Sequence, residues 1–306
     1  MKTFDSVIIG GGPAGLSAGI YLARFNRSAL IIDHSRGRLR YHQVNENYLG
    51  FPKGVSARTL LKLGEKQAKK FGVTFADDEI IALRKNKTGF TIRGRKTSFK
   101  AKTVVFATGV KDRFPAFKGI EKYIGKSLFW CIICDGYKVR NKRVAVLGHE
   151  DTSIQFCLEL LNFTTDIVLL TNSEADGDHI SPKGLEKLKA KKIDIKYGSI
   201  VKVKGKSGMV QSITLDTGEQ IKADFIFNKQ GYVPRSDVAA KLGVITEGEG
   251  FIKVDQNQKT NIEGMYAAGD VTHNSLHQIL TAAHQGALAA VAINHDLFPP
   301  DQRLHM

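Results

Sequence analysis

The sequence predicts an α/β protein built from two Rossmann-like nucleotide-binding domains, and three observations lead to this prediction. A glycine-rich turn joins an apolar strand to a helix near residue 10, and a second strand–turn–helix motif begins near residue 143. Between the two motifs lies Cys131-Ile-Ile-Cys134, a pair of cysteines separated by two residues. The length of 306 residues is sufficient for two domains with sizeable cores.

The first motif has the pattern of a dinucleotide-binding turn. The buried-type strand Asp5–Gly10 runs into Gly10-Gly-Gly-Pro-Ala-Gly15, and an Ala- and Leu-rich helix follows. The second glycine of Gly-x-Gly-x-x-Gly, Gly12, lets the backbone approach a pyrophosphate, which then lies on the helix N-terminus. The next strand, 29–32, ends at Asp33, where a carboxylate is placed to bind a ribose hydroxyl.

Further segments between and after the two motifs have recognisable local patterns. An amphipathic helix is expected around Thr59–Phe71. An apolar strand from Thr103 stops at Ala107-Thr108-Gly109, where small residues let the backbone pass close to a cofactor. Near the end of the chain, Gly269-Asp270 precedes a helix rich in small residues, expected over Gln278–Ile293.

The second motif repeats the order of elements with a different turn. Its strand is Arg143–Leu147, its turn is Gly148–Ser153, and its helix extends to about Asn162. Another apolar strand, Asp166–Leu170, follows. This order predicts a second parallel sheet of the nucleotide-binding type.

The cysteine pair predicts thiol–disulfide chemistry. A Cys-x-x-Cys pair stabilises one thiolate through its neighbour, and thiolates attack disulfides. Asp135 follows directly and is placed to move the proton that each turnover requires. A zinc site with His273 and His277 is an alternative, but it would close across 139 residues (273 − 134), far from usual finger spacings. A purely structural disulfide is a second alternative, and no secretory context favours it.

Composition excludes some classes of protein and leaves others open. Hydrophobic residues make up 42% of the chain, and no apolar run reaches the roughly 20 residues that span a bilayer. With only three cysteines and no signal peptide pattern, a cytoplasmic location is expected. The net charge of +15 favours an acidic partner over nucleic acid, because no nucleic-acid-binding module is recognised. A merely solvated basic surface is the alternative.

Five ordered motifs resemble low-molecular-weight thioredoxin reductase over almost the whole chain. They are Gly-Gly-Gly-Pro-Ala-Gly-Leu, Glu-Asn-Tyr-x-Gly-Phe-Pro, Ala-Thr-Gly, Cys-x-x-Cys-Asp-Gly and Ala-Ala-Gly-Asp-Val. The resemblance implies a homodimer and an FAD-binding domain formed by residues 1–112 and 248–306. It also implies an inserted NAD(P)-binding-like domain, 113–247, that carries the redox-active disulfide.

The resemblance implies roles for individual residues. Cys134 would receive electrons from the flavin, Cys131 would attack the protein substrate, and Asp135 would act as acid and base. The adenosine and pyrophosphate of FAD would be held by Gly10, Gly12, Gly15 and Asp33. The ribityl chain and the flavin ring would lie along Asn47, Asp270, Gln278 and Ile279. The other predicted cofactor-binding residues are Pro13, Ala14, Ala107, Thr108, Gly109 and Gly269. No metal site is predicted.

The second turn departs from the family pattern. The family carries Gly-x-Gly-x-x-Ala at its NADPH pyrophosphate, whereas this chain has Gly148-His-Glu-Asp-Thr-Ser153. Glu150 places a side chain and a negative charge where backbone and pyrophosphate nearly touch. The family's His-Arg-Arg for the 2′-phosphate is replaced by Thr171-Asn172-Ser173, followed by the acidic residues Glu174, Asp176 and Asp178. The pattern resembles the branch described as deeply rooted or ferredoxin-dependent flavin thioredoxin reductases.

The leading hypothesis is therefore an FAD enzyme that reduces a protein disulfide, that of thioredoxin, with electrons from an acidic carrier such as ferredoxin. The alternatives are an NAD(P)H-dependent thioredoxin reductase with an altered nucleotide site and a non-catalytic, redox-sensing flavoprotein. A thioredoxin-reductase-like ferredoxin–NADP reductase would need the altered site and would lack the cysteine pair. Cys157 is interpreted as a core residue, and His295, Phe298 and His305 either cover the flavin or form a disordered end.

Overall fold

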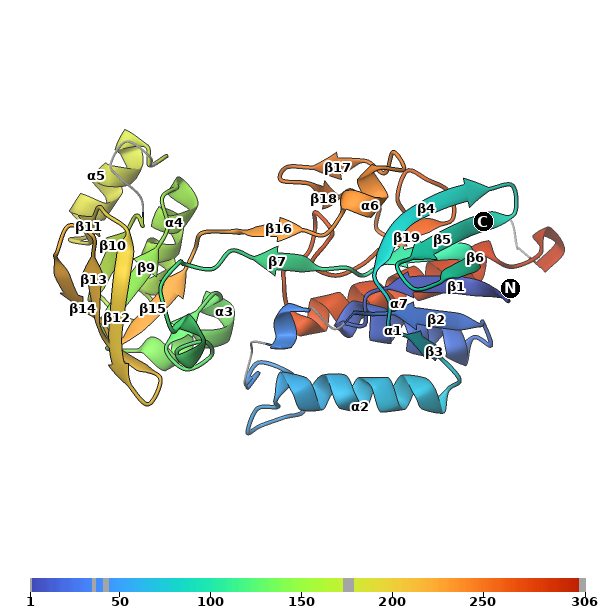
Figure 1. Ribbon diagram of the computed structural model, residues 1–306, viewed down its shortest axis with the longest axis horizontal. Helices are drawn as coiled ribbons and strands as arrows, with labels where there is room; N and C mark the ends of the chain where they lie inside the picture. The colour runs from blue at the N-terminus through green and yellow to red at the C-terminus, as the bar shows by residue number, and fades with distance from the viewer. Residues whose placement is uncertain (1, 35–36, 41–43, 173–178, 303–306) are drawn as a thin grey trace. The chain divides into compact units, whose positions relative to one another are not determined.

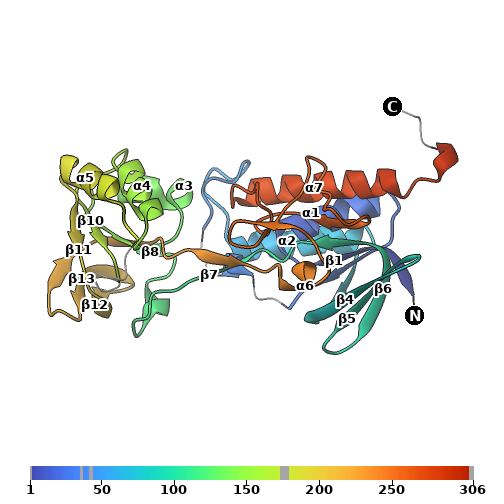
Figure 2. The same cartoon turned by 90° about the horizontal axis from the view of Figure 1, so that it is seen from above.

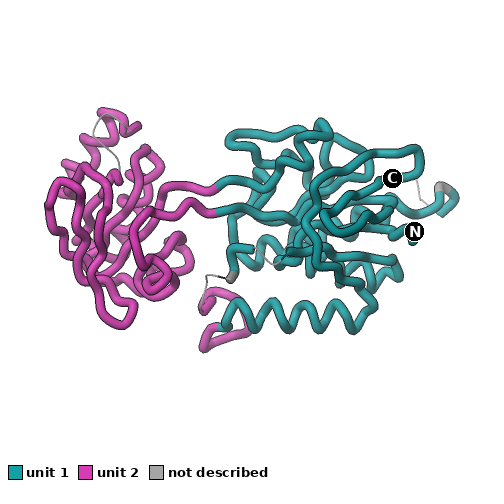
Figure 3. The backbone as a smooth tube through the Cα atoms, viewed as in Figure 1, with its two compact units in different colours: residues 1–40, 55–111, 233–306 teal, residues 41–54, 112–232 magenta. Residues whose placement is uncertain are grey.

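The described residues form two compact units. The computed structural model describes residues 2–34, 37–40, 44–172 and 179–302. Unit 1 consists of residues 1–40, 55–111 and 233–306, and unit 2 consists of residues 41–54 and 112–232 (Figure 3). The predicted α/β class with two Rossmann-like sheets is confirmed. The predicted domain limits, 1–112 with 248–306 and 113–247, stay a prediction.

The central sheet of unit 1 mixes parallel and antiparallel strands (Figure 1). Its strands are β1 (Thr3–Ile9), β2 (Ala29–Ile32), β3 (Thr74–Ala76), β4 (Ile80–Asn86), β5 (Gly89–Gly94), β6 (Ser98–Phe106) and β19 (Met265–Ala267). The order is β3-β2-β1-β6-β5-β4, and β19 also pairs with β6. The pairs among β1, β2, β3, β6 and β19 are parallel, so the carboxyl ends of these strands meet at one edge, where ligands of such sheets bind.

Two helices of unit 1 bring the ends of the chain together. The helices of this unit are α1 (Pro13–Arg24), α2 (Ala57–Lys70), α6 (Asp237–Ala240) and α7 (Ile279–Asp296). Helices α1 and α7 run side by side along the sheet (Figure 2). Their contact is close enough that a Cβ on Gly286 would lie 2.1 Å from the carbonyl oxygen of Ala14. Only glycine permits this approach.

Unit 2 contains a fully parallel sheet of five strands. Its strands are β8 (Leu128–Phe129), β9 (Val144–Leu147), β10 (Ile167–Leu170), β11 (Asp194–Lys196) and β15 (Phe225–Asn228). The order is β11-β10-β9-β15-β8, and all residues of β9, β10 and β15 are buried, as expected of a sheet with both faces covered. The helices are α3 (Ile132–Asp135), α4 (Asp151–Leu160) and α5 (Pro182–Ala190).

Smaller elements complete the two units. A three-stranded antiparallel sheet in unit 2 consists of β12 (Ile200–Lys206), β13 (Met209–Leu215) and β14 (Gln220–Lys222). The two-stranded pairs are β7 (Val110–Asp112) with β16 (Tyr232–Pro234) and β17 (Thr246–Glu247) with β18 (Phe251–Ile252). The 3₁₀ turns lie at Arg38–Arg40, Ile120–Lys122, Gly136–Val139 and Pro300–Gln302. None of the helices in the described part of the chain has the length and apolar character to cross a membrane.

Candidate active site and nucleotide cradles

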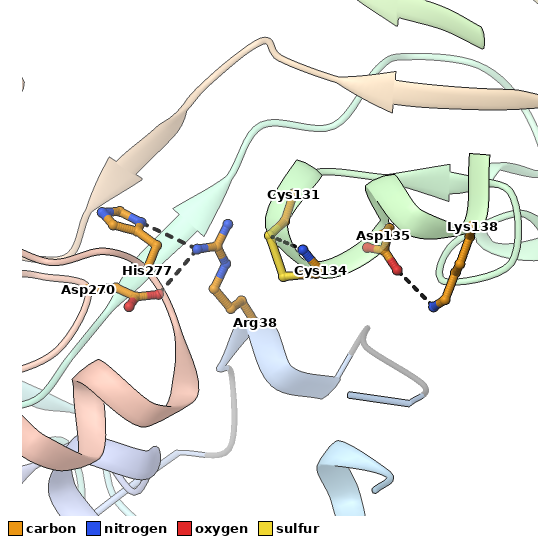
Figure 4. The surroundings of a disulfide bond; sticks show 7 residues. All are labelled: Arg38, Cys131, Cys134, Asp135, Lys138, Asp270 and His277. Atoms are coloured by element: carbon orange, nitrogen blue, oxygen red, sulfur yellow. Dashed lines mark hydrogen bonds and ion pairs between the residues drawn. A yellow bond between two sulfur atoms is a disulfide. The ribbon is translucent and has the colours of Figure 1, made fainter. Parts of the chain in front are cut away.

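The predicted cysteine pair forms a disulfide at the start of α3 in unit 2 (Figure 4). The Cα atoms of Cys131 and Cys134 are 5.3 Å apart, and both residues are half-buried. Cys131 occupies the N-cap position, and its Sγ accepts a hydrogen bond of 3.1 Å from the backbone N–H of Cys134. After reduction, a donor at this place favours the thiolate form of Cys131, because hydrogen bonds to a charged form stabilise it.

Asp135 lies beside the disulfide, buried and ion-paired. Its side chain is 7% exposed, and its Oδ1 lies 2.9 Å from Nζ of Lys138 (Figure 4). Lys138 also lies 3.8 Å from Oε2 of Glu46 and 5.4 Å from the ring centroid of Phe129. The sequence analysis did not identify Lys138, although its position three residues after Asp135 on a helical turn is the usual signal for such a pair.

A pocket of unit 2 adjoins this ion pair. Asp135 and Lys138 line it together with Asp112 and the aromatic side chains of Phe114 and Trp130. The rings of Phe114 and Trp130 meet edge to face, with centroids 5.1 Å apart. The pocket therefore presents a small number of charged groups within an aromatic wall, an arrangement that orients polar groups and limits access of water.

The cysteine outside the disulfide has no such surroundings. Cys157 is fully buried in α4, and burial raises the pKa of its thiol to about 12. A thiol that stays protonated at neutral pH is not a nucleophile. Within the described residues, no three His, Cys, Asp or Glu side chains form a group that would hold a metal ion. His273 lies 3.9 Å from Glu247, and His277 lies 3.4 Å from Arg38.

The first glycine-rich turn, between β1 and α1, forms an open cradle. Gly10 has a φ of +112°, and a Cβ there would lie 2.2 Å from the carbonyl oxygen of Ala107. A Cβ on Gly15 would lie 1.9 Å from the carbonyl oxygen of Gly10. These two glycines allow the strand, turn and helix to pack. A Cβ on Gly12, in contrast, would meet no described atom within 4 Å, so this glycine leaves space for a ligand.

The edges of this cradle suit a dinucleotide. Pro13 begins α1, and no described side chain caps the helix at Gly12. The first N–H groups of α1 are therefore available to a phosphate. Asp33, at the end of β2, accepts a hydrogen bond of 3.1 Å from the backbone N–H of Gly11. The cradle thus fits the pyrophosphate of FAD, with Ala14 in the first turn of the helix.

A second group of predicted residues lies after β19 in unit 1. Asp270 forms an ion pair of 3.1 Å with Arg38, and both side chains are less than a fifth exposed (Figure 4). Gly269, with a φ of +81°, donates its N–H to Oε1 of Gln285 at 2.8 Å. Helix α7 begins next, with Gln278 at its N-cap and Ile279 as its first residue. Arg38, which is 232 residues from Asp270, and Gln285, which is 16 residues from Gly269, were not predicted from the sequence.

The remaining residues predicted to bind the cofactor are Asn47 and the run from Ala107 to Gly109. Ala107 is buried and donates its N–H to the carbonyl oxygen of Ile9 at 2.9 Å. Thr108 donates its hydroxyl to the carbonyl oxygen of Arg235 at 2.6 Å, and Gly109 has a φ of +65°. Asn47 is exposed in the segment that belongs to unit 2. Their contacts with a flavin stay predictions.

Only part of the predicted C-terminal tail is described. Phe298 packs its ring 5.6 Å from the Arg27 guanidinium. His295 lies 6.3 Å from the same ring. His305 lies outside the described residues, so a flavin-covering tail stays a hypothesis.

The turn of the second motif, between β9 and α4, has the same close packing as the first turn. It differs on the side where the first turn is open to a ligand. A Cβ on Gly148 would lie 1.9 Å from Oγ of Ser153, so the first glycine is again required for packing. The place of Gly12 is taken by Glu150, which is the N-cap of α4 and has a half-exposed side chain. A carboxylate therefore stands where a pyrophosphate would approach the helix.

Two of the residues that replace the family's 2′-phosphate clamp are described. Thr171 is fully buried, and Asn172 has a φ of +55°. Oδ1 of Asn172 accepts a hydrogen bond of 2.9 Å from the N–H of Ile200, so its amide supports the start of β12. The predicted positions Ser173, Glu174, Asp176 and Asp178 lie outside the described residues.

Comparisons with known proteins agree with this arrangement. The family model for pyridine nucleotide-disulphide oxidoreductase matches residues 4–286. The chain is 32% identical to thioredoxin reductase of Aquifex aeolicus (strain VF5), and the match covers 96% of this chain and 93% of that protein. It is 30% identical to thioredoxin reductase of Bacillus subtilis (strain 168), over 96% of this chain and 95% of that protein.

A solved structure extends the likeness to three dimensions. The crystal structure of thioredoxin reductase from Streptococcus pyogenes MGAS5005 superposes with a TM-score of 0.90 at 27% identity. The match covers 96% of this chain and 98% of that one. The chain therefore belongs to the thioredoxin reductase family of pyridine nucleotide-disulphide oxidoreductases, and it is an FAD-dependent oxidoreductase that acts on a sulfur group.

Proposed function

We propose that this protein reduces the disulfide of a thioredoxin-like protein with electrons from a small acidic carrier such as ferredoxin, in place of NADPH. One observation supports this choice of donor above all others. The cradle of unit 2, where the family binds NADPH, carries Glu150 at the position of the ligand-facing glycine. A carboxylate at a pyrophosphate costs several kcal/mol through like-charge repulsion.

Within this function, the two cysteines have separate roles. Cys131 attacks the substrate disulfide as a thiolate, which breaks the substrate S–S bond and forms a mixed disulfide. The hydrogen bond from the Cys134 N–H to Cys131 Sγ supports this assignment. Cys134 then attacks Cys131, which releases the substrate as a dithiol and restores the Cys131–Cys134 disulfide. Asp135 moves the proton that the leaving thiolate needs.

The residues proposed to hold the cofactor lie in unit 1, except Asn47, which belongs to unit 2. FAD would supply a store for two electrons between a one-electron carrier and the cysteine pair. Its pyrophosphate would lie on the turn and first residues of α1, and its ribose against Asp33. The residues proposed to hold it are Gly10, Gly12, Pro13, Ala14, Gly15, Asp33, Asn47, Ala107, Thr108, Gly109, Gly269, Asp270, Gln278 and Ile279.

Exposed apolar side chains next to the disulfide support a protein as the substrate. Ile133, between the two cysteines, is 57% exposed, and Tyr137 is 66% exposed. The guanidinium of Arg140 stacks 3.7 Å from the centroid of the Tyr137 ring. Aromatic and arginine side chains of this kind are enriched in protein interfaces, where they contribute much of the binding energy.

The charge of the chain supports an acidic donor. The net charge of +15 attracts acidic proteins and raises their rate of association. Transient docking suits a carrier that delivers one electron and must leave. We place the enzyme in the cytoplasm as a homodimer on the basis of its family resemblance.

Anaerobic rapid mixing of the holoenzyme with each donor tests this proposal. Reduced ferredoxin should bleach the flavin absorbance quickly at low salt. Near molar salt the bleaching should be much slower, because the Debye length falls to about 3 Å at 1 M and charges further apart are screened. NADPH and NADH should bleach it slowly or not at all. Rapid bleaching by micromolar NADPH would replace the proposal with an NAD(P)H-dependent thioredoxin reductase. Flavin reduction without any release of substrate dithiol would favour a redox-sensing flavoprotein.

A further inference from the structure

The second cradle, the turn between β9 and α4, keeps the backbone packing of a nucleotide-binding turn. A failure to bind a nucleotide must therefore come from the side chains and segments around this turn. Gly148 and Ser153 pack as closely as the strand–turn–helix motif requires. The Oγ of Ser153 has no hydrogen-bond partner among the described residues and lies beneath the turn. Helix α4 starts in the same way as α1, with an extended N-cap residue. The difference lies in what covers the outer side of the turn.

A short stretch of chain, residues 179–181, lies across the turn, and we name it the strap. The backbone N–H of His179 donates to the carbonyl oxygen of His149 at 2.7 Å, and His179 forms a parallel bridge with Glu150. Two residues on, the N–H of Ser181 donates to Oδ1 of Asp151 at 2.8 Å. The backbone and hydroxyl of Ser181 lower the pKa of the Asp151 carboxyl. The strap is thus tied to three consecutive residues, His149, Glu150 and Asp151, which form the end of the turn and the first residue of α4.

The positive charge of a lysine partly offsets the negative charge of Glu150 in this turn. Lys229, directly after β15, is half-buried, and its Nζ lies 5.4 Å from the ring centroid of Phe156. Burial lowers its pKa, while the carboxylates of Glu159 and Glu150 act in the opposite direction. Lys229 is the kind of cation that would attract a phosphate, but here it already faces two carboxylates of its own chain.

We propose that unit 2 excludes nicotinamide dinucleotides by a device of its own, in which Glu150 occupies the pyrophosphate position and the strap lies along the end of the turn that leads into α4. The inference rests on the proposed function and explains how the donor is selected. The negative charges of Glu150 and Asp151 repel any phosphate at the start of α4. The backbone N–H groups of the strap already bind the carbonyl oxygen of His149 and the carboxylate of Asp151, which border the turn. Unit 2 then serves to carry the disulfide alone.

Calorimetric titration of the holoenzyme with ADP-ribose tests the device without any redox step. ADP-ribose carries the pyrophosphate and both riboses of NADH, and bound FAD keeps the first cradle filled. The wild-type protein should bind it only in the millimolar range. The variant Glu150→Gly/Asp151→Ala, which removes the charge and the anchor of Ser181, should bind at least about tenfold more tightly, a gain of about 1.4 kcal/mol. The control Glu121→Gln/Glu186→Gln removes two exposed carboxylates of unit 2 and should leave binding unchanged.

Two further measurements keep the test decisive if the double variant does not fold. Glu150→Gln changes only the charge and should tighten ADP-ribose binding by about threefold. Hydrogen exchange at the His179 amide of the wild-type holoenzyme should be at least about tenfold slower than in an unstructured chain.

The outcomes separate this inference from the proposed function. Micromolar ADP-ribose binding by the wild type, or an unprotected His179 amide, would overturn the device. A folded double variant with no gain would also overturn it, even where NADPH fails to bleach the flavin. If reduced ferredoxin does nothing while both variants gain affinity, the proposed donor is wrong and the device stands.

Discussion

The turn after β1 in unit 1 presents Gly12 at the start of α1, and the turn after β9 in unit 2 presents Glu150 at the start of α4. A Cβ at Gly12 would point into open space, whereas Glu150 adds a half-exposed carboxylate at the corresponding position. The packing positions are alike in both turns. A Cβ at Gly148 would lie as close to Ser153 as a Cβ at Gly15 would lie to Gly10.

This difference separates two requirements that a glycine-rich turn normally meets together. One requirement is the close packing of strand and helix, which the fold needs whether or not a ligand binds. The other is the approach of a phosphate, which only function needs. Under the proposed function, unit 2 satisfies the first requirement and not the second. A chain can therefore keep a nucleotide-binding fold as a support for other chemistry, here the disulfide of Cys131 and Cys134.

The largest effect is expected where unit 2 retains its chemistry. Cys134→Ser should keep bound FAD and reduce the release of substrate dithiol by at least about a thousandfold, because the resolving thiol is lost. The measurement is single-turnover dithiol release after chemical reduction of the flavin. Cys157→Ala, which removes the buried thiol of α4, is the matched control and should keep the rate. Substantial dithiol release by Cys134→Ser would contradict the assigned roles.

Exchanging the ligand-facing residue between the cradles sharpens the comparison directly. Gly12→Glu gives unit 1 the residue of unit 2 and should weaken FAD binding by about a hundredfold or more, through repulsion of the pyrophosphate. The open space around Gly12 lets the variant fold. FAD affinity is measured by flavin fluorescence on reconstitution of apoprotein, with Gly12→Ala as the control that adds a Cβ and no charge. Equal FAD affinities of the two variants would show that the charge of the side chain does not determine FAD binding.

A smaller effect is expected at the ion pair beside the disulfide. Lys138→Met should lower the rate of substrate reduction by about tenfold, because the ammonium 2.9 Å from Asp135 orients this buried carboxylate. Lys138→Arg should restore most of the rate, and the exposed Lys118→Met serves as a control for loss of charge. The measurement is kcat and KM for the protein disulfide. An effect on KM alone would assign Lys138 to substrate docking.

The smallest effect is expected beneath the turn of unit 2. Ser153→Ala removes a buried hydroxyl that has no described partner and should change stability by no more than about 1 kcal/mol, in the stabilising direction. Thermal unfolding of the holoenzyme measures it. Marked destabilisation would mean that the hydroxyl has a structural role in this cradle.

The sequence was sufficient for the features that depend on local pattern. The buried strands read as apolar runs, the helices began after glycine-rich turns, and the spacing of Cys131 and Cys134 indicated a disulfide. The predicted helix over Gln278–Ile293 corresponds to α7, which extends to Asp296. Such features depend on neighbours within a few residues, and their periodicity is visible in the chain itself.

Contacts between distant residues could not be predicted in this way. Arg38 and Asp270 are 232 residues apart, and nothing local indicates their ion pair. The same holds for Ser181 on Asp151, 30 residues apart, and for the amide of Asn172, which supports β12. Sequence reasoning identified Thr171 and Asn172 as a lost phosphate clamp and did not show that one is buried and the other structural. These roles depend on the packed fold and not on residue type.

The contact between α1 and α7 has a consequence for the biosynthesis of the protein. During translation, the whole of unit 2 leaves the ribosome before residue 233, and its parallel sheet has all its strands by then. Unit 1 still lacks β19 and α7, so Gly286 has not yet met Ala14 and the first cradle is incomplete. Domains generally fold as units while the chain emerges. We therefore expect the disulfide-bearing unit to complete its fold first, and the first cradle to become complete only after the last helix has been synthesised.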